Sequence, residues 1–176
     1  MDNSEVKPSD WRTKPLVGWV SLAARLLLGG CLLYAGLTKI VDLKQSVIAV
    51  RAYEFPIPDS IASLLGYGLP IVEILLGLAI VVGLVTRWVA ALGGASMIAY
   101  IAAIISVWAR GLSIDCGCFT PGGLLGPEEK TKYAIDILRD LGLLLCAVWI
   151  VLFPNSRVSL DSWLRSSPDK ESQDHA

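Results

Sequence analysis

Hydrophobic residues are gathered into four long runs that short polar segments separate. The runs cover about residues 16–40, 61–85, 89–109 and 133–153. Each holds roughly 20 residues, which at about 1.5 Å per helical residue matches a hydrocarbon core of about 30 Å. Because backbone polar groups in lipid must be bonded within their own segment, the runs are predicted to be helices. The expected fold is an all-α integral membrane protein, a bundle of four transmembrane helices.

The composition agrees with this fold class. Of the 176 residues, 54% are hydrophobic and 18% are charged, and the mean hydropathy is +0.60. The formal net charge is −1, so no basic surface argues for a nucleic-acid partner. We expect one membrane domain over residues 16–153, with disordered polar tails at residues 1–15 and 154–176.

Orientation in the membrane is not decided by charge. Four crossings would place both termini on one side of the bilayer. Lysine and arginine residues are divided almost evenly between that side and the other. The positive-inside rule therefore gives no clear preference, and the orientation has to be argued from the chemistry of the loops.

The main chemical feature is a Cys-Gly-Cys triplet, Cys116-Gly117-Cys118, in the polar segment before the fourth run. In an extended chain, residues two apart have Cα atoms about 6.5 Å apart, at the upper end of what a disulfide spans. Gly117 permits backbone angles that shorten this distance. The small ring would be strained, and strain raises the reduction potential of a disulfide. The triplet is therefore a candidate for thiol–disulfide redox chemistry.

Other roles for Cys116 and Cys118 stay open. As a structural staple, a three-residue loop would contribute only about 1.6 kcal/mol, against about 3 kcal/mol for a fifteen-residue loop. As metal ligands, two thiolates are too few to close a tetrahedral zinc site, although two thiolates would suit linear Cu(I). The remaining cysteines, Cys31 and Cys146, lie near the middle of the first and fourth runs. We expect them to act as small hydrophobic residues.

Two charges lie deep in the first two runs, where each needs a partner or a purpose. Counted from the side of the termini, Arg25 and Glu73 differ in depth by roughly 4.5 Å at the helical rise. We expect them to form an ion pair. Glu73 also shares one helical face with Gly66, Pro70 and Gly77, which favours close packing of that face against a neighbour.

A second group of charges lies near the Cys-Gly-Cys segment. Asp136, Arg139 and Asp140 share one face at the start of the fourth run, and Lys39 ends the first run. A cation there would favour a reactive thiolate, while anchoring of the helix at the membrane interface is the competing explanation. Arg25, Lys39, Glu73, Arg139 and Asp140 are thus candidate supporting residues for the two cysteines.

Five segments follow one another along the four runs: Arg25, residues 34–39, residues 70–73, residues 115–119 and residues 138–140. In these segments the chain resembles the DoxX-like superfamily, and within it the branch of the methylamine utilisation protein MauE, over about residues 16–153. One departure is Thr120 after Phe119, where the family commonly has glycine. The resemblance implies thiol handling during maturation of a disulfide-rich exported protein and, by analogy, contact with a quinone.

The favoured interpretation is a membrane thiol–disulfide redox protein that serves an exported thiol protein or a thioredoxin-like partner. Since the cytosol keeps thiols reduced, we expect a multi-pass protein of the cell membrane with cytoplasmic termini and an extracytoplasmic Cys-Gly-Cys loop. The alternative is a non-catalytic maturation or assembly factor that holds a client protein or Cu(I). A small-solute transporter that uses Arg25 and Glu73 would require a homo-oligomer, because four helices leave little room for a pathway.

Overall fold

The computed structural model describes residues 15–115, 123–124 and 132–153. The predicted tails lie outside the described residues except for Pro15, and so do Cys116 and Cys118. Within the described part, helices dominate. In chain order the elements are α1 (Pro15–Ile40), α2 (Leu43–Ala52), α3 (Asp59–Val82), α4 (Thr86–Ala109), β1 (Ile114–Asp115), β2 (Gly123–Leu124) and α5 (Tyr133–Leu152). The four predicted runs are confirmed as the four long helices α1, α3, α4 and α5.

Three of these helices have the length and composition of membrane spans. They are α1, α3 and α4, whose most apolar stretches have mean hydropathies of 1.9, 2.2 and 1.9. The chain is therefore a membrane protein, as predicted. Helix α5 is not among these spans, because Asp136, Arg139 and Asp140 lie near its start. The fourth predicted crossing is not established by length and composition.

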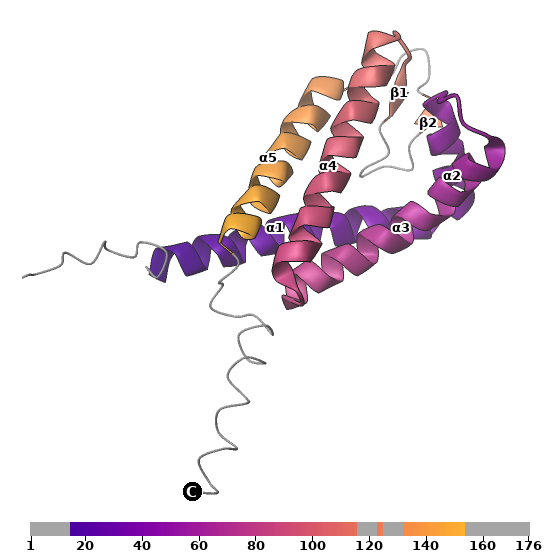
Figure 1. Ribbon diagram of the computed structural model, residues 1–176. Helices are drawn as coiled ribbons and strands as arrows, with labels where there is room; N and C mark the ends of the chain where they lie inside the picture. The colour runs from indigo at the N-terminus through magenta and orange to yellow at the C-terminus, as the bar shows by residue number, and fades with distance from the viewer. Residues whose placement is uncertain (1–14, 116–122, 125–131, 154–176) are drawn as a thin grey trace, which may run out of the picture.

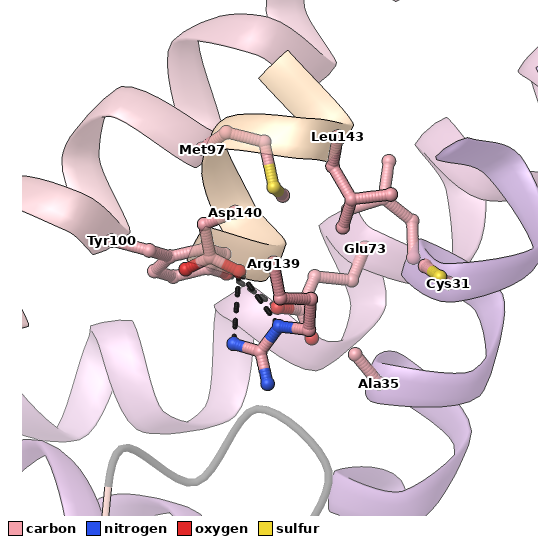
Figure 2. Close-up of a pocket in the computed structure, with 9 residues that line it drawn as sticks. Cys31, Ala35, Glu73, Met97, Tyr100, Arg139, Asp140 and Leu143 are labelled. Atoms are coloured by element: carbon pink, nitrogen blue, oxygen red, sulfur yellow. Dashed lines mark hydrogen bonds and ion pairs between the residues drawn. The ribbon is translucent and has the colours of Figure 1, made fainter. Parts of the chain in front are cut away.

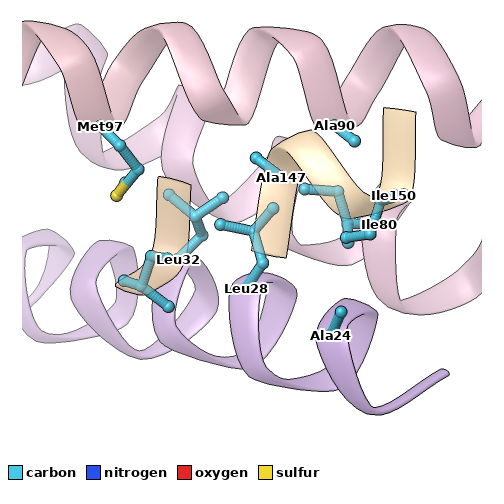
Figure 3. Packing of buried hydrophobic residues seen from close by; sticks show 9 residues of the cluster. Ala24, Leu28, Leu32, Ile80, Ala90, Met97, Ala147 and Ile150 are labelled. Carbon is cyan, nitrogen blue, oxygen red and sulfur yellow. The ribbon is translucent and has the colours of Figure 1, made fainter. Parts of the chain in front are cut away.

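The long helices form two pairs. Helix α1 packs along α3, and α4 packs along α5. In Figure 1 the α4–α5 pair crosses the α1–α3 pair steeply. The main hydrophobic cluster fills the region between the pairs, and all four long helices contribute to it (Figure 3). Its buried members are Ala24, Leu28, Leu32, Ile80, Ala90, Met97, Leu143, Ala147 and Ile150.

Glycine residues allow α1 and α3 to approach closely. A Cβ atom added to Gly29 would lie 2.9 Å from the carbonyl oxygen of Gly77, and one added to Gly36 would lie 2.8 Å from that of Pro70. Such distances leave no room for a larger side chain, so the two backbones are in direct contact. These two contacts fix the register of α1 against α3.

The predicted face of α3 is confirmed. Gly66, Pro70, Glu73 and Gly77 are all buried, at spacings of four, three and four residues. The first of them packs against Val47 of α2. Most of this face serves tight packing, and Glu73 is its charged member.

The short helix α2 was not predicted, because residues 41–60 contain no apolar run long enough to cross a membrane. Its first turn is capped by Asp42, whose side chain accepts a hydrogen bond of 3.0 Å from the backbone N–H of Gln45. Ser46, Val47 and Ala52 form its buried face. Packing of this face against α3, and not hydrophobic length, therefore stabilises α2.

Candidate functional site

The structure defines both ends of the segment that contains the Cys-Gly-Cys triplet. Strands β1 and β2 pair antiparallel, with Ile114 opposite Leu124 and Asp115 opposite Gly123. The paired strands flank residues 116–122, and α2 packs against β2. The two candidate catalytic residues, Cys116 and Cys118, lie outside the described residues, so their roles stay a prediction.

Tyr133 holds the chain immediately before β1. Its hydroxyl donates a hydrogen bond of 2.6 Å to the carbonyl oxygen of Leu112 and accepts one of 2.9 Å from the backbone N–H of Ile114. Tyr133 itself is buried, in a second hydrophobic cluster with Ala52, Ile104, Val107 and Ile114. The first turn of α5 thereby positions the residues that lead into the Cys-Gly-Cys segment.

A polar cluster lies where α1, α3 and α4 meet. The Nζ atom of Lys39 donates hydrogen bonds of 2.7 and 3.0 Å to the two carboxylate oxygens of Glu73. The hydroxyl of Tyr100 donates to one of these oxygens, and Lys39 lies 5.4 Å from the centre of the Tyr100 ring. The side chain of Glu73 is only 3% exposed, so these contacts compensate for burying its charge.

The expected ion pair between Arg25 and Glu73 is wrong. The guanidinium group of Arg25 instead donates hydrogen bonds of 3.0 and 2.9 Å to the carbonyl oxygens of Ile80 and Val81. These carbonyls belong to the last turn of α3, where backbone acceptors have no partner within the helix. Arg25 therefore caps α3, and Lys39 is the partner of Glu73.

The register of the two helices explains this correction. Counting depth from the helix ends assumed that α1 and α3 end at the same level. Glu73 lies between the two glycine contacts described above, whereas Arg25 lies beyond them. Side chains also lean toward the N-terminus of their own helix. Arg25 therefore leans away from Glu73, and Lys39 leans toward it.

The charges at the start of α5 pair with one another. One guanidinium nitrogen of Arg139, Nη1, donates a hydrogen bond of 3.0 Å to Asp136. Its Nε atom donates to Oδ1 of Asp140 at 2.9 Å, and Nη2 lies 2.8 Å from the same oxygen. Asp140 is buried, with 2% of its surface exposed.

A small cavity brings these polar groups together. It has a volume of about 20 Å³ and lies between α1, α3, α4 and α5 (Figure 2). The residues that line it are Cys31, Leu32, Ala35, Glu73, Met97, Tyr100, Arg139, Asp140 and Leu143. Of the predicted supporting residues, Lys39, Glu73, Arg139 and Asp140 thus lie at or beside one site, and Arg25 does not.

Two residues that line the cavity, Tyr100 and Cys31, were not expected at a site from the sequence. Tyr100 was missed, although a phenolic hydroxyl in the middle of a charge-free run is a usable signal. Cys31 lines the cavity. Both Cys31 and Cys146 pack against the main hydrophobic cluster. Among the described residues, no group of three His, Cys, Asp or Glu side chains could hold a metal ion.

Comparison with known proteins assigns the chain to one family. The family model described as methylamine utilisation protein MauE matches residues 17–153, which include all five helices except the first two residues of α1. Searches among curated proteins and among solved structures find no significant match. Because the match covers well over half of the chain, we conclude that this membrane protein belongs to the MauE family.

Proposed function

We propose that this chain is a membrane thiol–disulfide redox protein in which Cys116 and Cys118 cycle between dithiol and disulfide. In one half-reaction, their disulfide takes two electrons and two protons from two thiols of an exported client or a thioredoxin-like partner, and the partner's disulfide forms. In the other, the two thiols pass two electrons and two protons to a lipid-dissolved quinone, which becomes a quinol. Exchange proceeds by attack of a thiolate on a disulfide sulfur.

The observation that carries this proposal is the anchoring of the Cys-Gly-Cys segment at both ends. The β1–β2 pairing and the hydroxyl of Tyr133 hold the flanking residues beside the start of α5. The same helix carries Arg139 in its second turn. A cation near the segment would favour the reactive thiolate. A structural staple is the weaker explanation for the two cysteines, because a three-residue ring contributes little stability.

Helix α5 has features that support a fourth crossing. Its 20 residues span about 30 Å, and its three charges are paired with one another. An apolar stripe formed by Leu138, Leu141, Leu145, Val148 and Leu152 is exposed along its length. Lipid would cover this stripe, so α5 is proposed as the fourth span. Both termini then lie on one side, and the Cys-Gly-Cys segment lies on the other.

The proposed membrane orientation is based on thiol chemistry, and the proposed biological role is based on the MauE family. Since the cytosol keeps thiols reduced, the Cys-Gly-Cys segment is proposed to face the extracytoplasmic side and the termini the cytoplasm. The family description, methylamine utilisation protein MauE, supports a role in methylamine utilisation, and the client is proposed to act in the same process. Contact with a quinone depends on the wider likeness to the DoxX-like superfamily, which stays a prediction.

The decisive experiment uses a variant in which Cys31→Ala and Cys146→Ala leave Cys116 and Cys118 as the only cysteines. Intact cells that express it are treated with a membrane-impermeant maleimide, with and without prior reduction. We expect labelling to rise after reduction, because the two sulfurs are bonded in the oxidised state. In parallel, client disulfide formation is measured in the Cys116→Ser/Cys118→Ser variant, which should lose it.

Two outcomes would contradict the redox proposal. One is client disulfides that form at the normal rate in the Cys116→Ser/Cys118→Ser variant. The other is labelling that does not respond to reductant. A non-catalytic assembly factor that holds a client or Cu(I) would give the first outcome, so the same experiment separates the two functions.

A further inference from the structure

The outer face of α2, formed by Val41, Lys44, Ile48 and Arg51, carries exposed apolar residues. Ile48, in the middle of the helix, is 50% exposed, and Val41, just before the helix, is 86% exposed. Lys44 and Arg51 lie one turn before and one turn after Ile48, so these three side chains share one side of the helix. Exposed apolar residues with charged neighbours are typical of interaction sites, so this face is a candidate interaction surface.

Both ends of α2 are tied to the ends of membrane spans. Only two residues separate the end of α1 at Ile40 from the start of α2 at Leu43. At the other end of α2, the guanidinium group of Arg110 donates hydrogen bonds of 2.5 and 3.2 Å to the carbonyl oxygens of Tyr53 and Glu54. Arg110 directly follows α4. Since α1 and α4 have the length and composition of spans, α2 lies at the level where these helices leave the bilayer.

The length and direction of α2 exclude a crossing. Its ten residues span about 15 Å, half of a hydrocarbon core of about 30 Å. Figure 1 shows α2 lying across the end of the α1–α3 pair instead of along it. The inner side of α2 packs against α3, where Val47 meets Gly66 in the second turn of that helix. The helix therefore lies in the plane of the membrane surface, with its outer face directed away from the bundle.

The surroundings of the outer face favour lipid as its partner. Leu37 near the end of α1 and Leu64 near the start of α3 are 53% and 70% exposed on the adjoining spans, so the apolar surface of α2 continues a surface that lipid covers. Phe55, just after α2, lies 5.8 Å from the guanidinium carbon of Arg110. Arginine and lysine extend their charges to the headgroups while their apolar stems stay in the membrane. The basic residues of the face suit this position.

We infer that α2 is an interfacial helix whose outer face, with Val41 and Ile48, inserts into the membrane at the boundary between lipid headgroups and acyl chains. Helices of this kind lie about 5–10 Å deep in that boundary. Because α2 packs against β2, its insertion holds the two strands that flank the Cys-Gly-Cys segment at the membrane surface. There a soluble client and a lipid-dissolved quinone both have access. That use rests on the proposed function, whereas the insertion itself does not.

The test is spin-label accessibility in the full-length protein, reconstituted into phosphatidylcholine bilayers. In a background without the four native cysteines, Val41→Cys and Ile48→Cys each carry a nitroxide. We expect these labels to collide several-fold more often with oxygen, relative to a water-soluble nickel complex, than a label at Asp59→Cys, a position that is 87% exposed. A label at Leu64→Cys on α3 is the lipid-facing control. Nickel access at Val41 and Ile48 equal to that at Asp59 would place the face in water and overturn the inference. Poor access of both reagents would mean that protein covers the face, such as a second copy of the chain, and would also overturn it.

A second measurement uses the wild-type sequence, so it does not depend on whether a variant folds. Two photoactivatable phosphatidylcholines carry a diazirine, one near the glycerol backbone and the other at the end of an acyl chain. We expect peptides from residues 41–55 to react with the first probe, and the middle of α4 around Ile98, which is 57% exposed, to react with the second. No reaction of residues 41–55 with either probe would contradict the insertion of α2. Neither measurement involves thiol chemistry, so failure of the redox proposal and failure of this inference are distinguishable.

Discussion

Single residues decide which buried charges the bundle tolerates. Glu73 is held by Lys39 and Tyr100, and Arg25 is held by backbone carbonyls at the end of α3. Each of these charges has several polar contacts, as burial in a low-dielectric environment demands. Removing one partner should therefore cost more than the loss of an exposed ion pair.

Substitution of Lys39 by methionine tests this expectation. Lys39→Met leaves the Glu73 carboxylate buried without its cation, so we expect a loss of about 3 kcal/mol in the free energy of unfolding. The matched control is Arg51→Met, which breaks the exposed pair with Asp59 and should cost at most about 1 kcal/mol. Unfolding in detergent measures both. Equal losses would show that Lys39 does not stabilise Glu73, and Lys39→Met/Glu73→Gln should recover part of the loss.

Gly83 provides a second test at the same scale. Its φ angle is +81°, and a Cβ atom there would lie 2.3 Å from Nη2 of Arg25. Gly111 has a φ angle of +70° but no atom within 4 Å of its added Cβ. Both substitutions by alanine incur backbone strain of about 1–2 kcal/mol, and only Gly83→Ala also displaces Arg25. We expect a lower melting temperature for Gly83→Ala than for Gly111→Ala, and equal values would exclude a steric role.

At the scale of elements, the structure depends on how helices pair. Helices α1 and α3 touch through glycines, and a hydrogen-bond chain joins α1 to the end of α5. In that chain Trp149 donates to the hydroxyl of Ser21 at 3.2 Å, and Ser21 donates to the carbonyl oxygen of Phe153 at 3.0 Å. Small residues and polar links are the usual means of joining helices in lipid, where apolar contact alone gives little driving force.

Substitutions at two adjacent glycines of α1 distinguish the contribution of helix packing to stability from that of helix propensity. A Cβ atom at Gly29 would lie 2.7 Å from Val81 and 2.9 Å from the backbone of Gly77, whereas one at Gly30 would meet nothing within 4 Å. We expect Gly29→Ala to destabilise the protein by about 1–3 kcal/mol through overpacking. Gly30→Ala should be neutral or slightly stabilising, because alanine favours the helix. In thermal unfolding in detergent, we expect a lower melting temperature for Gly29→Ala than for Gly30→Ala. Equal or reversed melting temperatures would contradict the register of α1 against α3.

At the scale of the whole molecule, the apolar surface requires lipid. Large hydrophobic residues are exposed on all four long helices, among them Leu16, Leu64, Trp88 and Leu145 at 70% or more. A water-soluble protein of this size does not expose so much apolar surface. The exposed stripe of α5 continues this surface, which supports the proposal that α5 is a fourth span.

The number of crossings is testable by accessibility. In a background without Cys31, Cys116, Cys118 and Cys146, a single cysteine is introduced as Ser172→Cys near the C-terminus. An impermeant maleimide should label it only after the cells are permeabilised. Cys116 and Cys118, kept as the only thiols and reduced beforehand, should be labelled in intact cells. Labelling of both positions from the same side would mean that α5 does not cross the bilayer.

Much of the fold was predictable, because it depends on local properties of the chain. The long helices follow from runs of apolar residues, and the buried face of α3 follows from spacing. The candidate site was predictable in part. Lys39, Glu73, Arg139 and Asp140 stood out as costly charges. The ion pair between Arg25 and Glu73 was wrong, and Tyr100 was missed, because both depend on how one helix is shifted against another.

Taken by itself, the order of apolar and polar residues determined the membrane class, the four long helices and the location of the Cys-Gly-Cys segment between two of them. The tertiary structure alone decided that Lys39 pairs with Glu73, that Arg25 caps α3, and that Asp140 faces a cavity shared by four helices. The physical reason is distance along the chain. Hydrophobic length and helical periodicity act within one segment, whereas ion pairs and cavities depend on the relative register of segments far apart in the sequence.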